Sequence, residues 1–185
     1  MPENSKANRG PSAGPANRAA LIKAAREVFA ESGLDAPLSA VARRAGVGQG
    51  SLYRHFPDRI ALGVAVFDDN IAQLEALAAA SGSTLVDLFD GIAEQAMSST
   101  ALIELTSAAR HDERAEHLAS RMTTLVDALV IRDRASGRIR EQVTTEDVML
   151  AIGMLAFLLA KTDADDRAHV AERARGIFRM AFTEG

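Results

Sequence analysis

The sequence predicts an all-α fold of about nine helices. Apolar residues recur three or four positions apart through most of the 185-residue chain, and no long segment alternates apolar with polar residues as a half-buried strand would. Glycines and capping sequences separate the periodic segments. Apolar residues make up 48% of the chain and aromatic residues 4%, which predicts a substantial and mostly aliphatic core. The length suits one large domain or two smaller domains packed together.

Residues 1–16 are rich in Pro, Gly, Ser, Asn and Ala, a composition that predicts a disordered tail. The alternative is a basic arm that contacts the minor groove of DNA through Lys6 and Arg9. The first helix is expected over residues 17–32, followed by Gly33 at the C′ position. Its buried stripe comprises Leu21, Ile22, Ala25, Val28 and Phe29.

The stretch from Ser39 to Phe56 predicts two short helices joined by a tight turn. Gly46 lies between them and can adopt a positive φ without a steric clash. Ser39 is expected near the N-cap of the first helix, and Gly48 at the start of the second. Each helix has an apolar face, formed by Val41, Ala42 and Ala45 in the first and by Leu52 and Phe56 in the second.

The outer faces of these two helices carry hydrogen-bond donors, amphipathic groups and cations but no carboxylate, which suits contact with nucleic acid. They comprise Arg43, Arg44, Gln49, Ser51, Tyr53, Arg54 and His55. The net charge of the whole chain is −4, yet the chain up to Phe67 carries nine basic and five acidic residues, against twelve and twenty in the remainder. A basic N-terminal third on an acidic body is typical of a DNA-binding part joined to another domain.

Residues 19–62 resemble the DNA-binding domain of the tetracycline-repressor (TetR) family of bacterial transcription regulators. The most specific match is Ala45-Gly46-Val47, Gly50-Ser51-Leu52-Tyr53 and His55-Phe56-Pro57 at that spacing. The resemblance implies DNA contacts from one set of side chains, with close approach of the duplex to Gly50. These are base or phosphate contacts from Gln49, Ser51 and Arg54, phosphate contacts from Tyr53 and His55, and candidate phosphate contacts from Ser39, Arg44 and Arg59.

The sequence departs from the family pattern at the start of the second short helix. Gly48 stands where family members usually have Ser or Thr, and Gln49 where Lys is frequent. Glycine can cap a helix but offers no hydroxyl to a phosphate. Glutamine lacks the lysine charge but can bind adenine through two hydrogen bonds.

Amphipathic patterns predict the remaining helices. A long helix begins at Asp58, its expected N-cap, and carries apolar residues every three or four positions to Ala78. Residues 81–83 end it, and a capping box at Thr84 and Asp87 begins the next helix. A short helix is expected over residues 100–109 and a longer one over 112–136, closed by Gly137. A second capping box, at Thr144 and Asp147, begins a helix that extends to residue 161, and acidic residues 163–166 suit the N-terminus of the last helix.

Methionine and phenylalanine residues on different C-terminal helices are candidates for an adaptable ligand pocket, with ordinary core packing as the alternative. They are Phe89, Met97, Met122, Met154 and Phe157. The run from Val148 to Ala160 is apolar nearly all round, which predicts burial on several sides. In the TetR family the last two helices form a four-helix dimer interface. The resemblance therefore implies a homodimer, and packing within one chain is the alternative.

No motif of an enzyme is present, since the chain lacks G-x-S-x-G, a Walker loop, H-E-x-x-H and any cysteine. His111 and His117 are six positions apart on different helix faces and predict no joint metal site. We expect no cofactor and no catalytic residue. The longest apolar run has 13 residues, fewer than the ~20 that a membrane span needs, and no signal peptide is apparent, so a cytoplasmic protein is expected.

These observations predict a tail over residues 1–16, a helix-turn-helix DNA-binding domain over 17–62 and a ligand-binding and dimerisation domain over 63–185. By resemblance, the chain is expected to be a transcriptional repressor that leaves a palindromic DNA operator when a small apolar or amphipathic effector binds. A ligand-independent DNA-binding or adaptor protein is one alternative, and an α-helical small-molecule enzyme is another.

Overall fold

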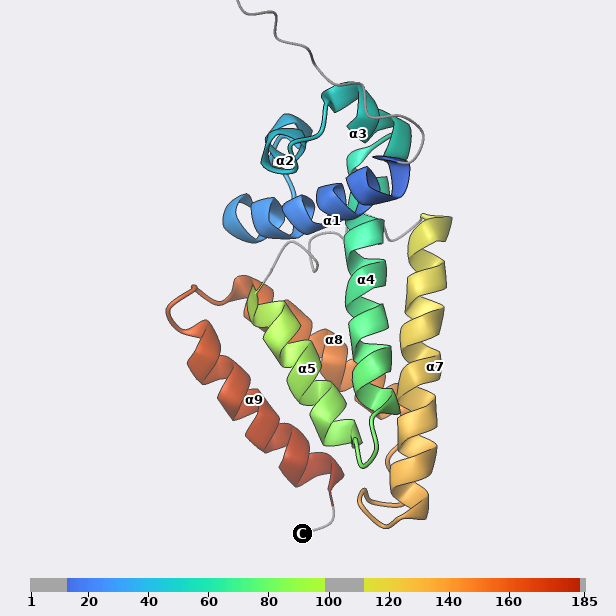
Figure 1. Cartoon of the computed structure of the whole chain (residues 1–185). Coiled ribbons are helices and arrows are strands. Elements are labelled where there is room, and N and C mark those ends of the chain that lie inside the picture. Colours follow the sequence, from blue (N-terminus) through green and yellow to red (C-terminus); the bar gives the residue numbers. More distant parts are fainter. Residues whose placement is uncertain (1–12, 99–111, 184–185) are drawn as a thin grey trace, which may run out of the picture.

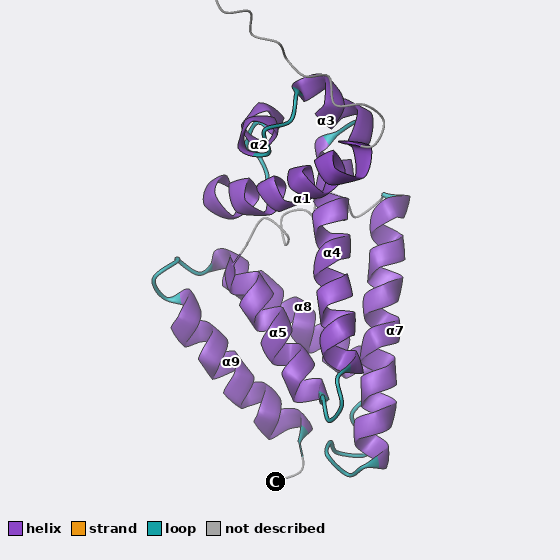
Figure 2. Cartoon of the chain, viewed as in Figure 1, coloured by secondary structure: helices purple, strands orange, loops and turns teal. Residues whose placement is uncertain are grey.

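The computed structural model describes residues 13–98 and 112–183, and its described secondary structure is helical (Figures 1 and 2). Within these ranges the only extended pairing is an isolated antiparallel bridge between Ile139 and Thr183. The all-α prediction is confirmed, with eight described helices against about nine expected; the helix predicted over residues 100–109 lies outside the described residues. The helices are α1 (Ala13–Ser32), α2 (Leu38–Arg44), α3 (Gln49–His55), α4 (Arg59–Ala79), α5 (Leu85–Ser98), α7 (Glu113–Ala135), α8 (Thr145–Lys161) and α9 (Arg167–Phe182).

Helices α1, α2 and α3 form a small domain at one end of the molecule, at the top of Figure 1. Gly33 ends α1 with a φ of 74°, and Gly46 joins α2 to α3 with a φ of 64°, a region of backbone conformation that strains other residues. Both turns were predicted. The apolar faces of the three helices share one core with the start of α4, which includes Leu21, Val28, Phe29, Val41, Leu52, Phe56, Leu62 and Val66.

One expected boundary in this domain is wrong. Helix α1 begins at Ala13, so residues 13–16 are helical rather than part of a tail; the rest of the predicted tail lies outside the described residues. Pro37 is the N-cap of α2, two residues before Ser39, and no side chain caps the helix. Proline has a fixed φ that suits the position just before a helix, so α2 can begin there without a capping hydroxyl.

Helix α4 belongs to both halves of the molecule. Asp58 caps it by accepting a hydrogen bond from the Ala61 N–H at 2.6 Å, as the sequence predicts. Its first turns contribute to the core of the small domain, its last turns contribute to the core of the body, and Phe67 packs against both cores. The domain boundary expected after residue 62 therefore falls inside a continuous helix.

In the body, α5 and α7 pack against α4, α8 packs against α5 and α7, and α9 packs against α5 and α8 (Figure 1). Aliphatic side chains dominate its core, and one aromatic pair joins α5 to α9: the rings of Phe89 and Phe178 stack with centroids 3.9 Å apart. Arg121 on α7 binds Asp68 and Glu75 on α4, with two hydrogen bonds of 3.0 and 2.8 Å to Glu75. These contacts hold α7 alongside α4.

Local capping sequences start several body helices where predicted. Thr84 and Asp87 exchange backbone and side-chain hydrogen bonds at the start of α5, and Thr144 and Asp147 form a capping box on α8. Asp112 caps α7, and Gly137 follows it with a φ of 67°. Each pattern lies within one helical turn, so no distant contact is needed to form it.

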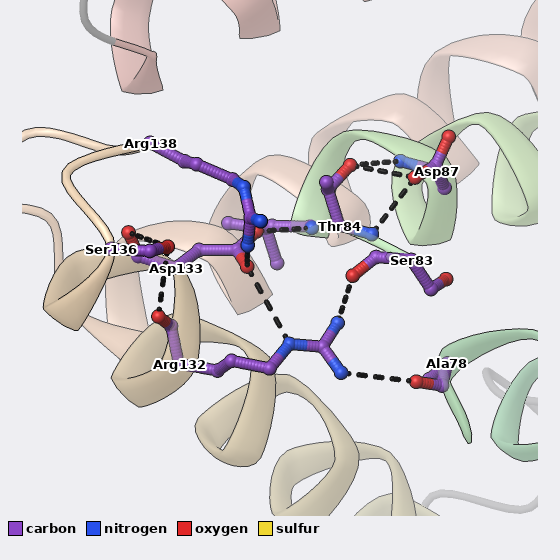
Figure 3. Close-up of polar contacts among 9 residues, drawn as sticks. Ala78, Ser83, Thr84, Asp87, Arg132, Asp133, Ser136 and Arg138 are labelled. Atoms are coloured by element: carbon purple, nitrogen blue, oxygen red, sulfur yellow. Dashed lines mark hydrogen bonds and ion pairs between the residues drawn. The ribbon is translucent and has the colours of Figure 1, made fainter. Parts of the chain in front are cut away.

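A polar cluster joins the C-terminal ends of α4 and α7 to the N-terminal end of α5 (Figure 3). Asp133 on α7, 1% exposed, accepts a 2.6 Å hydrogen bond from the backbone N–H of Leu85, the first residue of α5. Arg132 donates to the carbonyl oxygens of Ala78 and Ser83. Arg138 approaches Asp133 at 3.4 Å. The cluster satisfies backbone groups at the end of α4, in the loop that follows it and at the start of α5.

None of the described helices combines the length and the apolar character needed to cross a membrane.

Candidate nucleic-acid interface

Helix α3 is fixed on the small domain by one face and exposed on the other. Leu52 and Phe56 are 1% and 3% exposed and pack in the domain core. Tyr53, between them in sequence, is 53% exposed and is a large apolar side chain on the outside of the domain. The backbone of the turn is also tied down, since the Val47 N–H donates to Ala42 at 3.0 Å and the Leu52 N–H to Gly48 at 3.1 Å. Core packing and backbone hydrogen bonds thus hold α3 in a fixed position, with its outer face toward solvent.

The residues predicted for DNA contact divide by exposure. Gln49, Gly50, Tyr53 and Arg54 on α3 and Ser39 on α2 are exposed, whereas Ser51 and His55 are half-buried. The ring of His55 lies tilted against that of Phe56, with centroids 6.2 Å apart. A Cβ atom added to Gly50 would meet no atom of another element within 4 Å, so internal packing does not require glycine there.

Arg44 and Arg59 make contacts within the protein. Arg44 donates two hydrogen bonds of 2.8 Å to Glu31 on α1 and lies 3.4 Å from Glu27. These hydrogen bonds lower the pKa of Glu31 and raise the pKa of Arg44. The Arg59 guanidinium is half-buried and donates to the carbonyl oxygens of Leu34 and Ala36, which fixes the loop between α1 and α2. Phosphate contact by either arginine stays a prediction, and it competes with these internal hydrogen bonds.

Arg43 is the cation that the sequence-based list of contacts omits. It lies on the last turn of α2, is exposed, and has no hydrogen-bond or ion-pair partner among the described residues. Arg54, in the last turn of α3, is exposed in the same way and equally lacks such a partner in the described ranges. In the sequence, Arg43 could be recognised only by its place on the polar face of α2. Arg44 is next to it and is also an arginine, so the sequence does not show which of the two is free to bind DNA.

We expect Arg43→Ala to weaken DNA binding more than Arg44→Ala does. Arg43 keeps its full charge available to a phosphate, while Arg44 has to leave Glu31 first. The expected loss for Arg43→Ala is roughly threefold to tenfold, with a shallower dependence of affinity on salt. Fluorescence anisotropy with a labelled operator fragment measures both quantities.

The adjacent variant is the matched control for this comparison. Arg44→Ala should instead lower the melting temperature at neutral pH, because Glu31 loses its partner. The pKa of Glu31 is lowered in the folded state, so the contribution of the pair is present above the ordinary value of 4.5 and disappears as pH falls below it. Equal losses of DNA affinity in the two variants would contradict the prediction that Arg43 contributes more to DNA binding than Arg44.

The first turn of α7 contacts the base of the small domain. Arg114 lies 3.5 Å from Asp58, the N-cap of α4, and donates a 2.6 Å hydrogen bond to Asp112. The hydrogen bonds that Asp112 accepts from the side chain and backbone N–H of Arg114 lower the pKa of Asp112 to about 2. Ala115 packs against the core of the small domain. Contact between body and small domain is therefore made next to the end of α3, as well as through α4.

The predicted ligand-pocket residues do not gather at one site. Phe89 and Met122 are buried and Met97 is half-buried, all in the body core. Met154 and Phe157 are 59% and 64% exposed on the outer face of α8, apart from the other three, and their place in a ligand pocket stays a prediction. Helix α8 is apolar nearly all round, and the residues that it buries in the body core are Val148, Leu155 and Leu159.

A large apolar surface covers the outer faces of α8 and α9. Six of the nine exposed large apolar side chains in the described ranges lie on these two helices: Leu150, Met154, Phe157, Leu158, Ile177 and Met180. We call this set the α8–α9 apolar face. Exposed apolar side chains concentrated on two helices that contact each other are characteristic of a surface that another protein covers.

The comparisons with known proteins agree with the geometry of the small domain. Residues 21–66 match the family model described as bacterial regulatory proteins, tetR family. The small domain is that of a TetR-family regulator. Among curated proteins, none matches this sequence.

Solved structures similar to the chain extend the likeness beyond the matched region. A TetR transcriptional regulator from Streptomyces coelicolor has 26% sequence identity and a TM-score of 0.63, with 91% of this chain and 99% of that chain covered. A TetR regulatory protein from Mycobacterium vanbaalenii has 24% identity and a TM-score of 0.67, with 94% and 98% covered. A gamma-butyrolactone receptor has 18% identity and a TM-score of 0.60, with 92% and 89% covered. The whole chain thus has the fold of a TetR-family transcriptional regulator.

Proposed function

We propose that this TetR-family protein is a cytoplasmic, homodimeric repressor that binds a palindromic DNA operator through α3 and leaves it when a small effector binds in the body. The observation that carries the DNA-binding part is the outer face of α3. It presents Gln49, Tyr53 and Arg54 to solvent and carries no carboxylate, while Leu52 and Phe56 hold the helix in the domain core. Such a face suits insertion into a major groove.

Gly50 supports close approach of DNA to this helix. A side chain at this position would have open space within the protein, so the absence of one serves no packing need. Glycine costs helix stability relative to alanine, and a reason for it outside the protein is close contact with a duplex backbone. Gln49, in the same turn, is exposed and offers the donor and acceptor that pair with an adenine edge.

The homodimer is supported by the α8–α9 apolar face. One seven-residue helix reads few base pairs, so two copies related by a two-fold axis are needed for a palindromic site. Pairing of α8 and α9 with their copies would cover Leu150, Met154 and Phe157, which water otherwise contacts. The same face favours a dimer over a strictly monomeric adaptor.

Effector release is supported by the path from body to DNA-binding domain. Helix α4 contributes to both cores, and Arg114 on α7 contacts its N-cap, Asp58. A ligand that favours one arrangement of α4 and α7 would change the spacing of the two copies of α3. The size of this effect is limited by the difference in the affinity of the ligand for the two arrangements of α4 and α7. A structural neighbour described as a gamma-butyrolactone receptor indicates that this fold accepts small molecules.

The test is selection of bound fragments from the source genome, followed by titration of a selected fragment at two salt concentrations. We expect Arg54→Ala to lower the affinity by about tenfold, ~1.4 kcal/mol, without changing the melting temperature, because Arg54 is exposed. If Arg54 contacts a phosphate, the salt slope also falls by about one, and if it contacts a base, the loss depends on the sequence of the fragment. Unchanged binding by Arg54→Ala would remove α3 as the DNA-contacting surface.

A further inference from the structure

We propose that Arg18 on α1 is a DNA-contacting residue, which binds a phosphate of the operator next to the C-terminal end of α3. This inference rests on the proposed function, because it adds a contact to the DNA-binding surface of that regulator. It concerns α1, a helix whose described residues have so far been given no contact with DNA.

Arg18 lies on the face of α1 that packs in the core of the small domain. Leu21, Ile22 and Ala25 follow it at spacings of three, four and seven residues, and all three are buried. Arg18 itself is exposed, so this face of the helix reaches the domain surface at its turn. An apolar side chain would serve the core equally well here, and packing therefore does not account for a charge.

The ring of Phe56 holds the guanidinium group of Arg18. The central guanidinium carbon lies over this ring, 5.5 Å from its centroid, within the range of a cation–π contact. Phe56 is the C-cap residue of α3, is 3% exposed, and donates its backbone N–H to the carbonyl oxygen of Leu52 at 2.8 Å. The charge is thus placed beside the end of α3 by a side chain that is itself fixed in the core.

The charge of Arg18 is available to a phosphate. Three other arginines of the small domain, Arg26, Arg44 and Arg59, donate hydrogen bonds to acceptors within the protein. Arg18 has no acidic or hydrogen-bonding partner in the part of the chain that the structure describes, and its contact there is with the aromatic ring. A planar guanidinium with unused N–H donors suits the oxygens of a phosphate.

The charges of α1 are divided between its two ends. Residues 13–26 include no carboxylate, whereas Glu27 and Glu31 lie near the C-terminus of the helix. Figure 1 shows the N-terminal end of α1 beside α3 and its C-terminal end away from α3. The part of α1 that carries Arg18 therefore adds positive charge to the surroundings of α3, and a DNA phosphate meets no like charge on it.

Arg18 and Arg43 lie near opposite ends of α3. Arg43 is on the last turn of α2, where its carbonyl oxygen accepts from the Gly46 N–H at 3.2 Å before α3 begins at Gln49. Arg18 contacts Phe56, which follows the last residue of α3. The seven residues of α3 span about 10 Å, so the two cations reach different phosphates. Their contributions to the affinity should therefore add.

The experiment measures the affinity of the full chain for the selected operator fragment by fluorescence anisotropy at several salt concentrations. Arg18→Gln removes the charge and keeps a polar side chain. We expect it to weaken binding roughly fivefold at low salt and to lower the salt slope by about one for each protomer bound. Arg18→Lys keeps the charge and should retain most of the wild-type slope.

Lys23→Gln is the matched control. Lys23 is an exposed cation on the same helix, but it lies about 140° round the helix axis from Arg18. This variant removes the same charge from the domain and should keep the wild-type salt slope. Melting temperatures distinguish a purely structural role of Arg18, which would lower the melting temperature of Arg18→Gln and leave the salt slope unchanged.

The outcomes separate this assignment from the proposed function. A wild-type salt slope in Arg18→Gln, or an equal fall in Lys23→Gln, would overturn the role of Arg18. The double variant Arg18→Gln, Arg43→Ala should lose about the product of the two single losses, and a loss no larger than that of Arg43→Ala alone would overturn it as well. If the wild type binds no genomic fragment, the proposed function itself is contradicted, and this contact with it.

Discussion

Replacing Asp133 with alanine is expected to lower the free energy of unfolding by about 2–4 kcal/mol. The carboxylate is 1% exposed and accepts a 2.6 Å hydrogen bond from the Leu85 N–H. Alanine would leave this buried N–H without an acceptor and open a cavity between α5 and α7. The ion pairs with Arg132 and Arg138 contribute less, since those side chains are 42% and 47% exposed and screened by water.

Urea unfolding at a fixed protein concentration, followed by circular dichroism, measures this loss. The midpoint should fall while the denaturant slope stays constant, because the extent of burial hardly changes. Asp127→Ala is the matched control: Asp127 lies on the same helix, is exposed and accepts a hydrogen bond from the Thr145 hydroxyl at 2.7 Å. Its loss should stay below about 1 kcal/mol. Equal losses in the two variants would show that the α5 contact of Asp133 is unimportant.

Asp133→Asn separates the hydrogen bond from the charge. Asparagine keeps an oxygen that can accept from Leu85 but removes the attraction to the two arginines. An intermediate loss, about 1 kcal/mol, is expected. The larger part of the alanine effect then comes from the backbone N–H at the start of α5.

The sequence predicts caps that lie within one turn and misses those between distant helices. Thr84 and Asp87 are three positions apart, so their pattern alone locates the start of α5. Asp133 serves the same helix end from 48 positions away, and no local pattern contains both partners. The available signal was an acidic residue on the inward stripe of α7, four positions after Leu129. A charge at such a position indicates a buried partner without identifying it.

The candidate site shows the same limit. Helical spacing predicts that Leu52 and Phe56 face the core and that Tyr53 and Arg54 face outward, as the structure has them. Spacing cannot distinguish Arg43 from Arg44, because the difference lies in Glu31 on another helix. Nor can it distinguish a ligand pocket from a partner surface, since both need apolar side chains. This is why Met154 and Phe157, which lie on an exposed face, were predicted to line a ligand pocket.

Replacing Phe157 with glutamate is expected to convert the protein to a monomer and to weaken operator binding by about 100-fold. Phe157 is 64% exposed and belongs to the α8–α9 apolar face. Two-fold pairing of this face would bring a glutamate of each copy into an apolar interface, where its charge loses hydration without an opposite partner. Sedimentation equilibrium gives the oligomeric state, and anisotropy with the selected fragment gives the affinity.

The two effects should be linked, because the second half-site is bound cooperatively only when the two copies are joined. A monomer retains the contacts of one α3 helix, so binding to an isolated half-site should change little while binding to the palindrome falls. Ile131→Glu is the matched control: Ile131 is 58% exposed on α7, outside the α8–α9 apolar face, and the variant should remain dimeric. The exposed position of Phe157 also means that glutamate should not unfold the chain. A Phe157→Glu protein that stays dimeric with normal affinity would place the dimer interface on another surface, and then the apolar side chains of α8 and α9 would need a different partner.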